Sequence, residues 1–202
     1  MDLAALAPII VVLCLGAMSP GPSLAVLLRN TLEGGRIRGV ACGIGHGIGF
    51  GIYAFIAING IAELKATGGN VATGLELLGA SFLFVLAYMM IKPSDSIDLS
   101  QQQSQRKGFT EGFLIAFLNP KILVFLIAIF SQFIMPDFTW TERLFVAIIA
   151  LSIDGGWYVM VALLITGTPL IEKLQQHERE VEVTMGLVLA GFAIWILSSL
   201  IV

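Results

Sequence analysis

Three ionisable side chains stand inside long apolar stretches of this sequence: His46, Lys121 and Asp154. An ionisable group is costly to place in a hydrophobic environment, so such groups pair with one another or face a polar cavity. Lys121 and Asp154 are the ion pair that we expect, either as a static bridge or as part of a coupling site. Asp154 is the first candidate for carrying a proton. His46 is the second candidate, with a hydrogen-bonded packing role as its alternative.

Prolines interrupt two apolar stretches, in MSPGPS at 18–23 and in LNPK at 118–121. Proline lacks an N–H and clashes with the carbonyl group four residues earlier, so each break is expected to free carbonyl groups and to start a new helix. A helix N-terminus, capped here by Ser19 or Ser23, suits a carboxylate group, and freed carbonyl groups suit an ammonium group. A simple kink satisfied by neighbouring helices is the alternative for either break alone. The candidate binding residues are Ser19, Pro20, Gly21, Pro22, Ser23, Asn119, Pro120 and Lys121.

Composition indicates a membrane protein. Hydrophobic residues make up 57% of the 202 residues and charged residues 12%, against about a quarter in soluble domains. Mean hydropathy is +0.92. No strand-length alternating pattern recurs, so every apolar stretch near the ~20 residues that cross a bilayer is predicted to be a helix. The prediction is an all-α integral membrane protein, a single domain over 1–202 with six transmembrane helices at about 3–28, 37–62, 71–91, 112–135, 144–166 and 184–202.

The second apolar stretch carries a glycine every four residues, at Gly39, Gly43, Gly47 and Gly51. Small residues at this spacing let helix backbones approach closely in a membrane, so these positions are predicted to form a packing face. The GIGHGIG segment lacks the strand and the lysine of a phosphate loop. No CxxC motif is present, and neither a cofactor nor a metal site is expected.

The chain also resembles itself at about half its length. Each half contains three spans, so the second half is predicted to be inverted in the membrane relative to the first, with helices one and four broken. Repeat one covers about 1–92 and repeat two about 108–202. The matching positions are Ser19-Pro20 with Asn119-Pro120, His46-Gly47 with Asp154-Gly155, and Gly79 and Tyr88 with Gly186 and Trp195.

Lysine and arginine are unevenly distributed between the two sides of this arrangement. Two lie on one side, Lys65 and Arg143, and eight lie on the other. Basic residues gather on the cytoplasmic side of membrane proteins. The 93–107 loop is therefore predicted to be cytoplasmic and both termini to lie outside. The eight are Arg29, Arg36, Arg38, Lys92, Arg106, Lys107, Lys173 and Arg179.

Several of these motifs together resemble the lysine-exporter family, LysE/RhtB, which includes exporters of lysine, homoserine and threonine. They are SPGP at 19–22, GFLIAFLNPKILVF at 112–125, SQF at 131–133 and the DGGWY segment. The resemblance implies six hydrophobic segments in the bacterial inner membrane, efflux driven by proton motive force, and a homodimer or higher oligomer. The family often has an acidic residue after PGP, where this chain has Ser23, which leaves the preferred substrate charge open.

The function predicted on these grounds is a secondary transporter, not an enzyme, that exports a small amino acid or derivative by proton antiport. Its partners are the amino acid and the lipid bilayer, with no nucleic acid. The alternative is an exporter of metal cations of the cadmium or nickel type. For a soft metal the candidate ligands are few: one intramembrane histidine, one aspartate and two separated cysteines.

Overall fold

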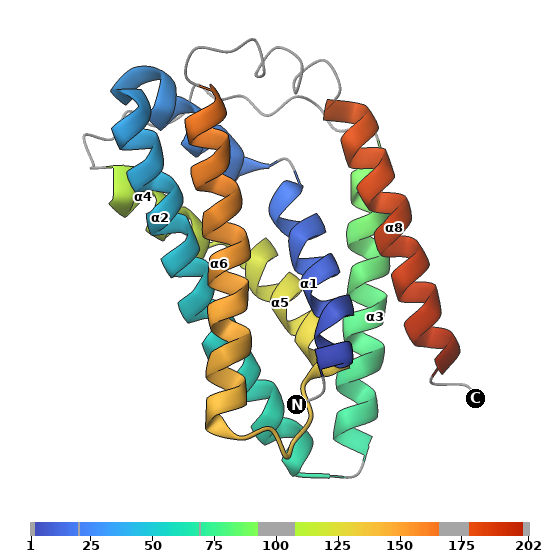
Figure 1. Ribbon diagram of the computed structural model, residues 1–202. Coiled ribbons are helices and arrows are strands. Elements are labelled where there is room, and N and C mark those ends of the chain that lie inside the picture. The colour runs from blue at the N-terminus through green and yellow to red at the C-terminus, as the bar shows by residue number, and fades with distance from the viewer. Residues whose placement is uncertain (1–2, 20, 69, 93–107, 166–177, 200–202) are drawn as a thin grey trace.

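A computed structural model describes residues 3–19, 21–68, 70–92, 108–165 and 178–199, and the regular elements in these ranges are helices (Figure 1). By length and composition α2 and α6 can cross a membrane, and α4 with α5 form a third candidate if the bent pair counts as one span. The helical elements confirm the all-helical prediction. The predicted 93–107 loop lies outside the described residues. The helices are α1 (Leu3–Met18), α2 (Pro22–Ala66), α3 (Asn70–Ile91), α4 (Gly108–Phe117), α5 (Pro120–Phe133), α6 (Trp140–Ile165) and α8 (Glu178–Ser199).

Both predicted helix breaks are present, one between α1 and α2 and the other between α4 and α5. The same backbone hydrogen bond closes the turn before each break. The Ser19 N–H donates to the Gly16 carbonyl group over 3.2 Å, and the Asn119 N–H donates to the Ala116 carbonyl group over 3.3 Å. Donors and acceptors lie 100 residues apart in the two halves. Backbone amides thus occupy these two carbonyl groups, which corrects the prediction that the prolines leave them free.

α2 runs through the region predicted to connect the first two spans. It bends at Gly35, whose φ of 74° and ψ of 179° interrupt the helix. Glycine adopts this left-handed φ without the steric cost that a side chain brings, so the chain can change direction at a single residue. We call residues 22–34 the short arm of α2 and residues 36–66 its long arm. Figure 1 shows the bend between them at the top of the molecule.

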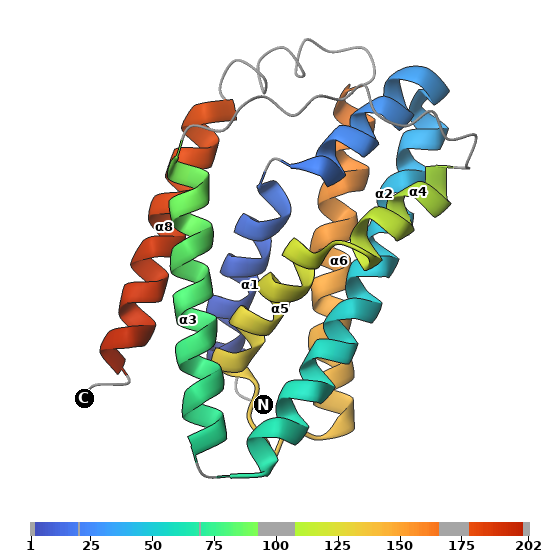
Figure 2. The same cartoon turned by 180° about the vertical axis from the view of Figure 1, so that it is seen from behind.

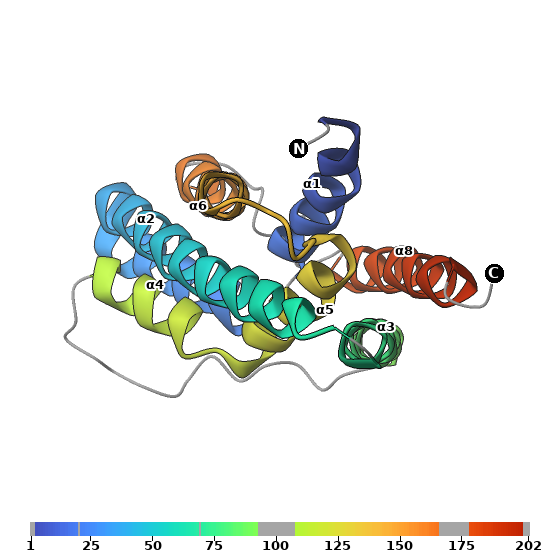
Figure 3. The ribbon, with the colours of Figure 1, turned by 90° about the horizontal axis from the view of Figure 1, so that it is seen from below.

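The long arm of α2 lies between α4 and α6 (Figure 3). It packs on α6 through Gly43, Gly47 and Gly51. A Cβ atom added at Gly47 would lie 2.5 Å from the Cα of Gly155, the residue that matches Gly47 in the other half of the chain. The two helices therefore cross at a pair of glycines that the predicted repeat places at matching positions. Gly39 instead faces Thr31 of the short arm.

This crossing makes a stability prediction. A Gly47→Leu variant should lose folded protein, because the new side chain meets the α6 backbone, which cannot move aside as a flexible side chain can. Overpacking of this kind costs about 1–3 kcal/mol or more. The matched control is Gly60→Leu in the same helix, since a Cβ there meets open space. Thermal unfolding in detergent should show a lower midpoint for Gly47→Leu and a wild-type midpoint for Gly60→Leu. Equal midpoints would contradict the tight crossing.

α3 and α8 pack side by side at one edge of the molecule, seen from both sides in Figures 1 and 2. α1 and α5 lie between this pair and the α2–α6 crossing (Figure 3). Buried side chains such as Leu13, Ile58, Leu83 and Phe130 join these elements in one apolar cluster. The packing holds both helix breaks inside the molecule, next to the centre of the α2–α6 crossing.

Candidate functional site

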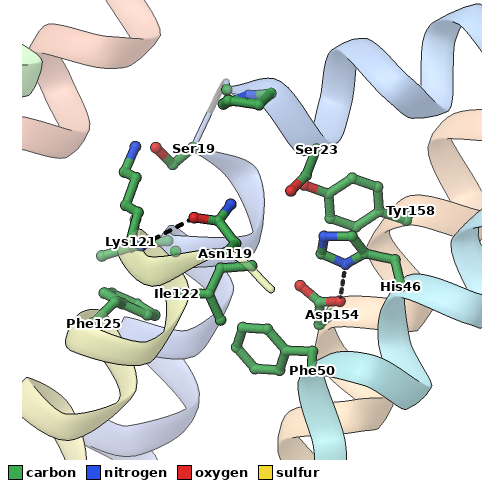
Figure 4. A pocket seen from close by; sticks show the side chains of 14 residues that line it. Ser19, Ser23, His46, Phe50, Asn119, Lys121, Ile122, Phe125, Asp154 and Tyr158 are labelled. Carbon is green, nitrogen blue, oxygen red and sulfur yellow. Dashed lines mark hydrogen bonds and ion pairs between the residues drawn. The ribbon is translucent and has the colours of Figure 1, made fainter. Parts of the chain in front are cut away.

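A cavity of about 60 Å³ lies where the two helix breaks face the long arm of α2 and α6 (Figure 4). Both predicted proton-coupling residues, His46 and Asp154, line it. Pro20 lies outside the described residues, and the side chain of Pro120 is not among those described. The other six predicted binding residues all line the cavity, and these are Ser19, Gly21, Pro22, Ser23, Asn119 and Lys121.

Two pairs of lining residues occupy matching positions in the two halves of the chain. His46 and Phe50 lie one helical turn apart on the long arm of α2, and Asp154 and Tyr158 lie one turn apart on α6. Each α6 residue follows its counterpart by 108 positions. The sequence analysis did not assign Phe50 or Tyr158 to the site, although their spacing of four from His46 and Asp154 could have found them. Transporters built from inverted repeats bind substrate at the interface of the repeats, and the predicted repeat would place matching residues together in such a cavity.

Asp154 pairs with His46, not with Lys121 as predicted. The His46 Nδ1 and Asp154 Oδ2 atoms are 2.6 Å apart, and the side chains are 2% and 4% exposed. The Tyr158 ring stacks on the imidazole with centroids 4.1 Å apart. Figure 4 shows the Lys121 side chain extending away from Asp154, on the opposite side of the cavity. Lys121 is the second residue of α5, after the N-cap Asn119 and Pro120.

The second nitrogen of His46, Nε2, is buried and has no hydrogen-bond partner among the residues that the structure describes. In Figure 4 it lies on the side of the ring away from the Asp154 bond, toward Ser23 and the space between the breaks. Buried polar groups in folded proteins nearly always have a hydrogen-bond partner. An unpartnered nitrogen beside a cavity is therefore a candidate to bind a ligand or a proton.

The two helix N-termini at the cavity differ in their capping. Gly21 is the N-cap of α2 and no side chain caps that helix, which corrects the expected cap by Ser19 or Ser23. The Ser23 hydroxyl instead lies beside the Tyr158 hydroxyl (Figure 4). At α5 the Asn119 Oδ1 accepts from the Lys121 backbone N–H over 2.9 Å. The Asn119 amide nitrogen points into the space between the breaks (Figure 4). Both N-termini can therefore present donors to an anionic group.

A second buried carboxylate, Glu111 on α4, escaped the sequence analysis because it precedes the fourth predicted span by one residue. It is 7% exposed. Its Oε2 accepts from Arg29 over 2.6 Å and from Asn30 over 2.8 Å, both on the short arm of α2. The Arg38 guanidinium of the long arm lies 3.6 Å from its Oε1. This cluster ties α4 to both arms of α2 at the end of the molecule that carries the bend.

Comparison with known proteins identifies the family. A family model described as LysE type translocator matches residues 14–200. The chain belongs to the LysE type translocators. As a translocator it is a membrane transporter and not an enzyme, and the cavity is therefore a candidate transport site.

Relatives of this LysE translocator include membrane proteins and named exporters. An uncharacterized membrane protein of Haemophilus influenzae is 24% identical over 194 residues, 91% of each chain. The homoserine/homoserine lactone efflux proteins of Salmonella typhimurium and Salmonella typhi are 30% and 32% identical over 124 and 125 residues, 60% of each chain. No solved structure matches the chain.

Proposed function

We propose that this LysE translocator exports a small amino acid or amino-acid derivative from the cytoplasm by antiport with protons. One observation carries the proposal. Both helix breaks line a single cavity, and that cavity holds a cationic group, Lys121, and an anionic group, Asp154, on opposite sides (Figure 4). A free amino acid carries both charges on one carbon atom. The two Salmonella relatives named as homoserine/homoserine lactone efflux proteins support a substrate of this class.

The lining suggests how such a substrate is oriented. Its carboxylate group faces the N-termini of α2 and α5, with the Asn119 amide and the Lys121 ammonium as further donors. Its ammonium group faces the buried His46–Asp154 pair. The remaining wall is apolar and includes Phe50 and Phe125, so it receives the substrate's side chain. A second charge on a long side chain would lie against this apolar wall, which favours small uncharged side chains.

The His46–Asp154 pair is the proposed site of proton coupling. It is buried, it lines the substrate cavity, and the ammonium group of the substrate competes with a proton for negative charge there. A proton taken up from outside would favour release of the substrate, and loss of that proton to the cytoplasm would favour reloading. Substrate then moves outward as protons move inward.

Transport assays in proteoliposomes test this function. Purified protein in vesicles with an acidic interior, clamped at zero voltage, should accumulate labelled homoserine as protons leave. One-for-one exchange supports at most about a tenfold accumulation per pH unit, because one unit corresponds to 1.36 kcal/mol. Dissipating the pH difference should abolish accumulation. If the vesicles move cadmium or nickel ions and no amino acid, the chain is a metal-cation exporter instead.

The proposed orientation places both chain ends on the outer side of the bacterial inner membrane, opposite the cytoplasm. Arg29 and Arg38 flank the α2 bend at Gly35 and both contact Glu111. α1 begins and α8 ends at the opposite end of the molecule from this bend (Figure 1). Alkaline phosphatase fused to the C-terminus should be active, and a fluorescent protein fused there should be dark. A fluorescent fusion with inactive phosphatase would reverse the orientation.

A further inference from the structure

The charge of Asp154 together with the geometry of the pair decides which ring nitrogen of His46 carries a hydrogen. An ionised carboxylate only accepts hydrogen bonds, so the short contact of Asp154 with Nδ1 places the hydrogen on Nδ1. In the neutral ring Nε2 then keeps its lone pair. This nitrogen is the buried, unpartnered atom that lies toward the cavity (Figure 4).

The groups around the ring leave Nε2 as the place where a ligand can bond. Asp154 and Tyr158 face it from α6, the first through Nδ1 and the second by stacking on the ring. Lys121 of α5 stands across the cavity, and Ser23 of the short arm lies beside Tyr158 (Figure 4). Cys42 lies one turn earlier on the same helix as His46. Within the described part of the chain no donor fills the Nε2 position.

We infer that His46 Nε2 is the single atom for which the substrate's ammonium group and the coupling proton compete, and that Asp154 is the positioning residue that fixes the ring for this exchange. This inference rests on the proposed function and deepens it. A neutral ring accepts one N–H of the ammonium group at Nε2. A protonated ring has an N–H there instead, so it can no longer accept a hydrogen bond and it repels the cation.

Protons balance through the cycle. When the site faces outside, a proton from water binds the Nε2 lone pair, the hydrogen bond to the substrate breaks, and the ammonium group leaves with all three of its own protons. When the site faces the cytoplasm, the Nε2 proton passes to water and a new ammonium group takes its place. Asp154 keeps its charge throughout, holds Nδ1–H and stabilises the charged ring, as a carboxylate does for histidine in other proteins.

A matched pair of substitutions tests the role of Nε2. Glutamine at position 46 can place a neutral acceptor near the Nε2 position, and the shorter asparagine reaches only the Nδ1 position. Neither can take up a proton. His46→Gln should therefore keep a weakened but measurable homoserine exchange across vesicles at equal pH and lose pH-driven accumulation, whereas His46→Asn should lose both. For the wild-type protein the apparent Kd for homoserine should rise roughly tenfold for each unit by which pH falls below the onset of ring protonation, because one proton displaces one substrate. For His46→Gln the Kd should stay constant.

A spectroscopic measurement reads the ring without altering it. The sequence contains two histidines, His46 and His177, so a His177→Gln protein carrying nitrogen-15 histidine reports His46 alone. The neutral ring should show hydrogen on Nδ1 and a bare Nε2, and added homoserine should release the Nε2 proton at acidic pH.

Hydrogen on Nε2 in the neutral ring, or homoserine binding with no change in ring protonation, would overturn the inference. So would His46→Gln accumulating homoserine under a pH difference as the wild type does. If the wild type accumulates no amino acid at all, the proposed function fails, and that result is distinct from either of these.

Discussion

An Asp154→Asn variant should insert normally and lose proton-driven accumulation of amino acid. Asparagine has nearly the same shape as aspartate but carries no charge, so it cannot stabilise a protonated His46 ring. Its amide can also donate to Nδ1, which would move the hydrogen of the neutral ring to Nε2 and remove the acceptor at the cavity. A hydrogen bond to a charged group contributes about 1.5–3 kcal/mol, so homoserine should bind roughly 10- to 150-fold more weakly. Uptake into vesicles under an imposed pH difference measures the loss.

The matched control for this variant is Asp137→Asn, because Asp137 is an exposed carboxylate between α5 and α6, outside the cavity. It should accumulate homoserine as the wild type does. Exchange at equal pH should be weakened in Asp154→Asn but still measurable, since the donors at both helix breaks remain. If Asp154→Asn concentrates homoserine against its gradient at the wild-type level, the His46–Asp154 bond is a packing contact and not part of the coupling.

Features set by local chemistry were predictable from the sequence. The two breaks occur because proline cannot continue the hydrogen-bond ladder, and this holds whatever the neighbouring helices do. The length of the apolar stretches also indicated that the chain is helical. The matching of His46 with Asp154 was also visible in the sequence, but the direct contact between the two side chains was not predicted from it. Residues near a two-fold axis meet their counterparts, so the predicted repeat pointed to this pair in place of Lys121 with Asp154.

Features set by packing were not predictable. The direction of Lys121 depends on how α5 is rotated about its axis, which a single sequence does not reveal. The residue at which α2 begins places Gly21 at the N-cap and Ser23 inside the first turn. The Ser23 hydroxyl then lies beside that of Tyr158, a residue distant in sequence. Glu111 was missed because the apolar stretch begins one residue after it. The helix and its burial nevertheless extend over Glu111. The continuation of α2 through Gly35 depends on one left-handed residue, and a GG pair at 34–35 suits a loop equally well.

Gly21 offers a way to block the cavity without disturbing the fold. Its φ of 174° and ψ of −171° are extended, and this conformation suits any residue that precedes a proline. Gly21 lies between α1 and α2 and lines the cavity. A Cβ atom added there meets nothing within 4 Å. A Gly21→Leu side chain would therefore occupy space that the substrate needs. The expected loss of transport therefore comes from filling the cavity.

Gly21→Leu should lower homoserine export at least about tenfold, the effect of losing some 1.4 kcal/mol of binding. Its unfolding free energy should stay within roughly 0.5 kcal/mol of the wild type, as for substitutions that meet no neighbour. Gly21→Ala should give an intermediate rate, because one methyl group fills less of the cavity. Gly74→Leu in α3 is the matched control, since a Cβ there also meets open space but lies away from the cavity. Full export by Gly21→Leu would mean that the substrate path does not pass between the two breaks. Loss of export by Gly74→Leu would mean that leucine impairs the protein at any exposed glycine, and the effect at Gly21 would then say nothing about the path.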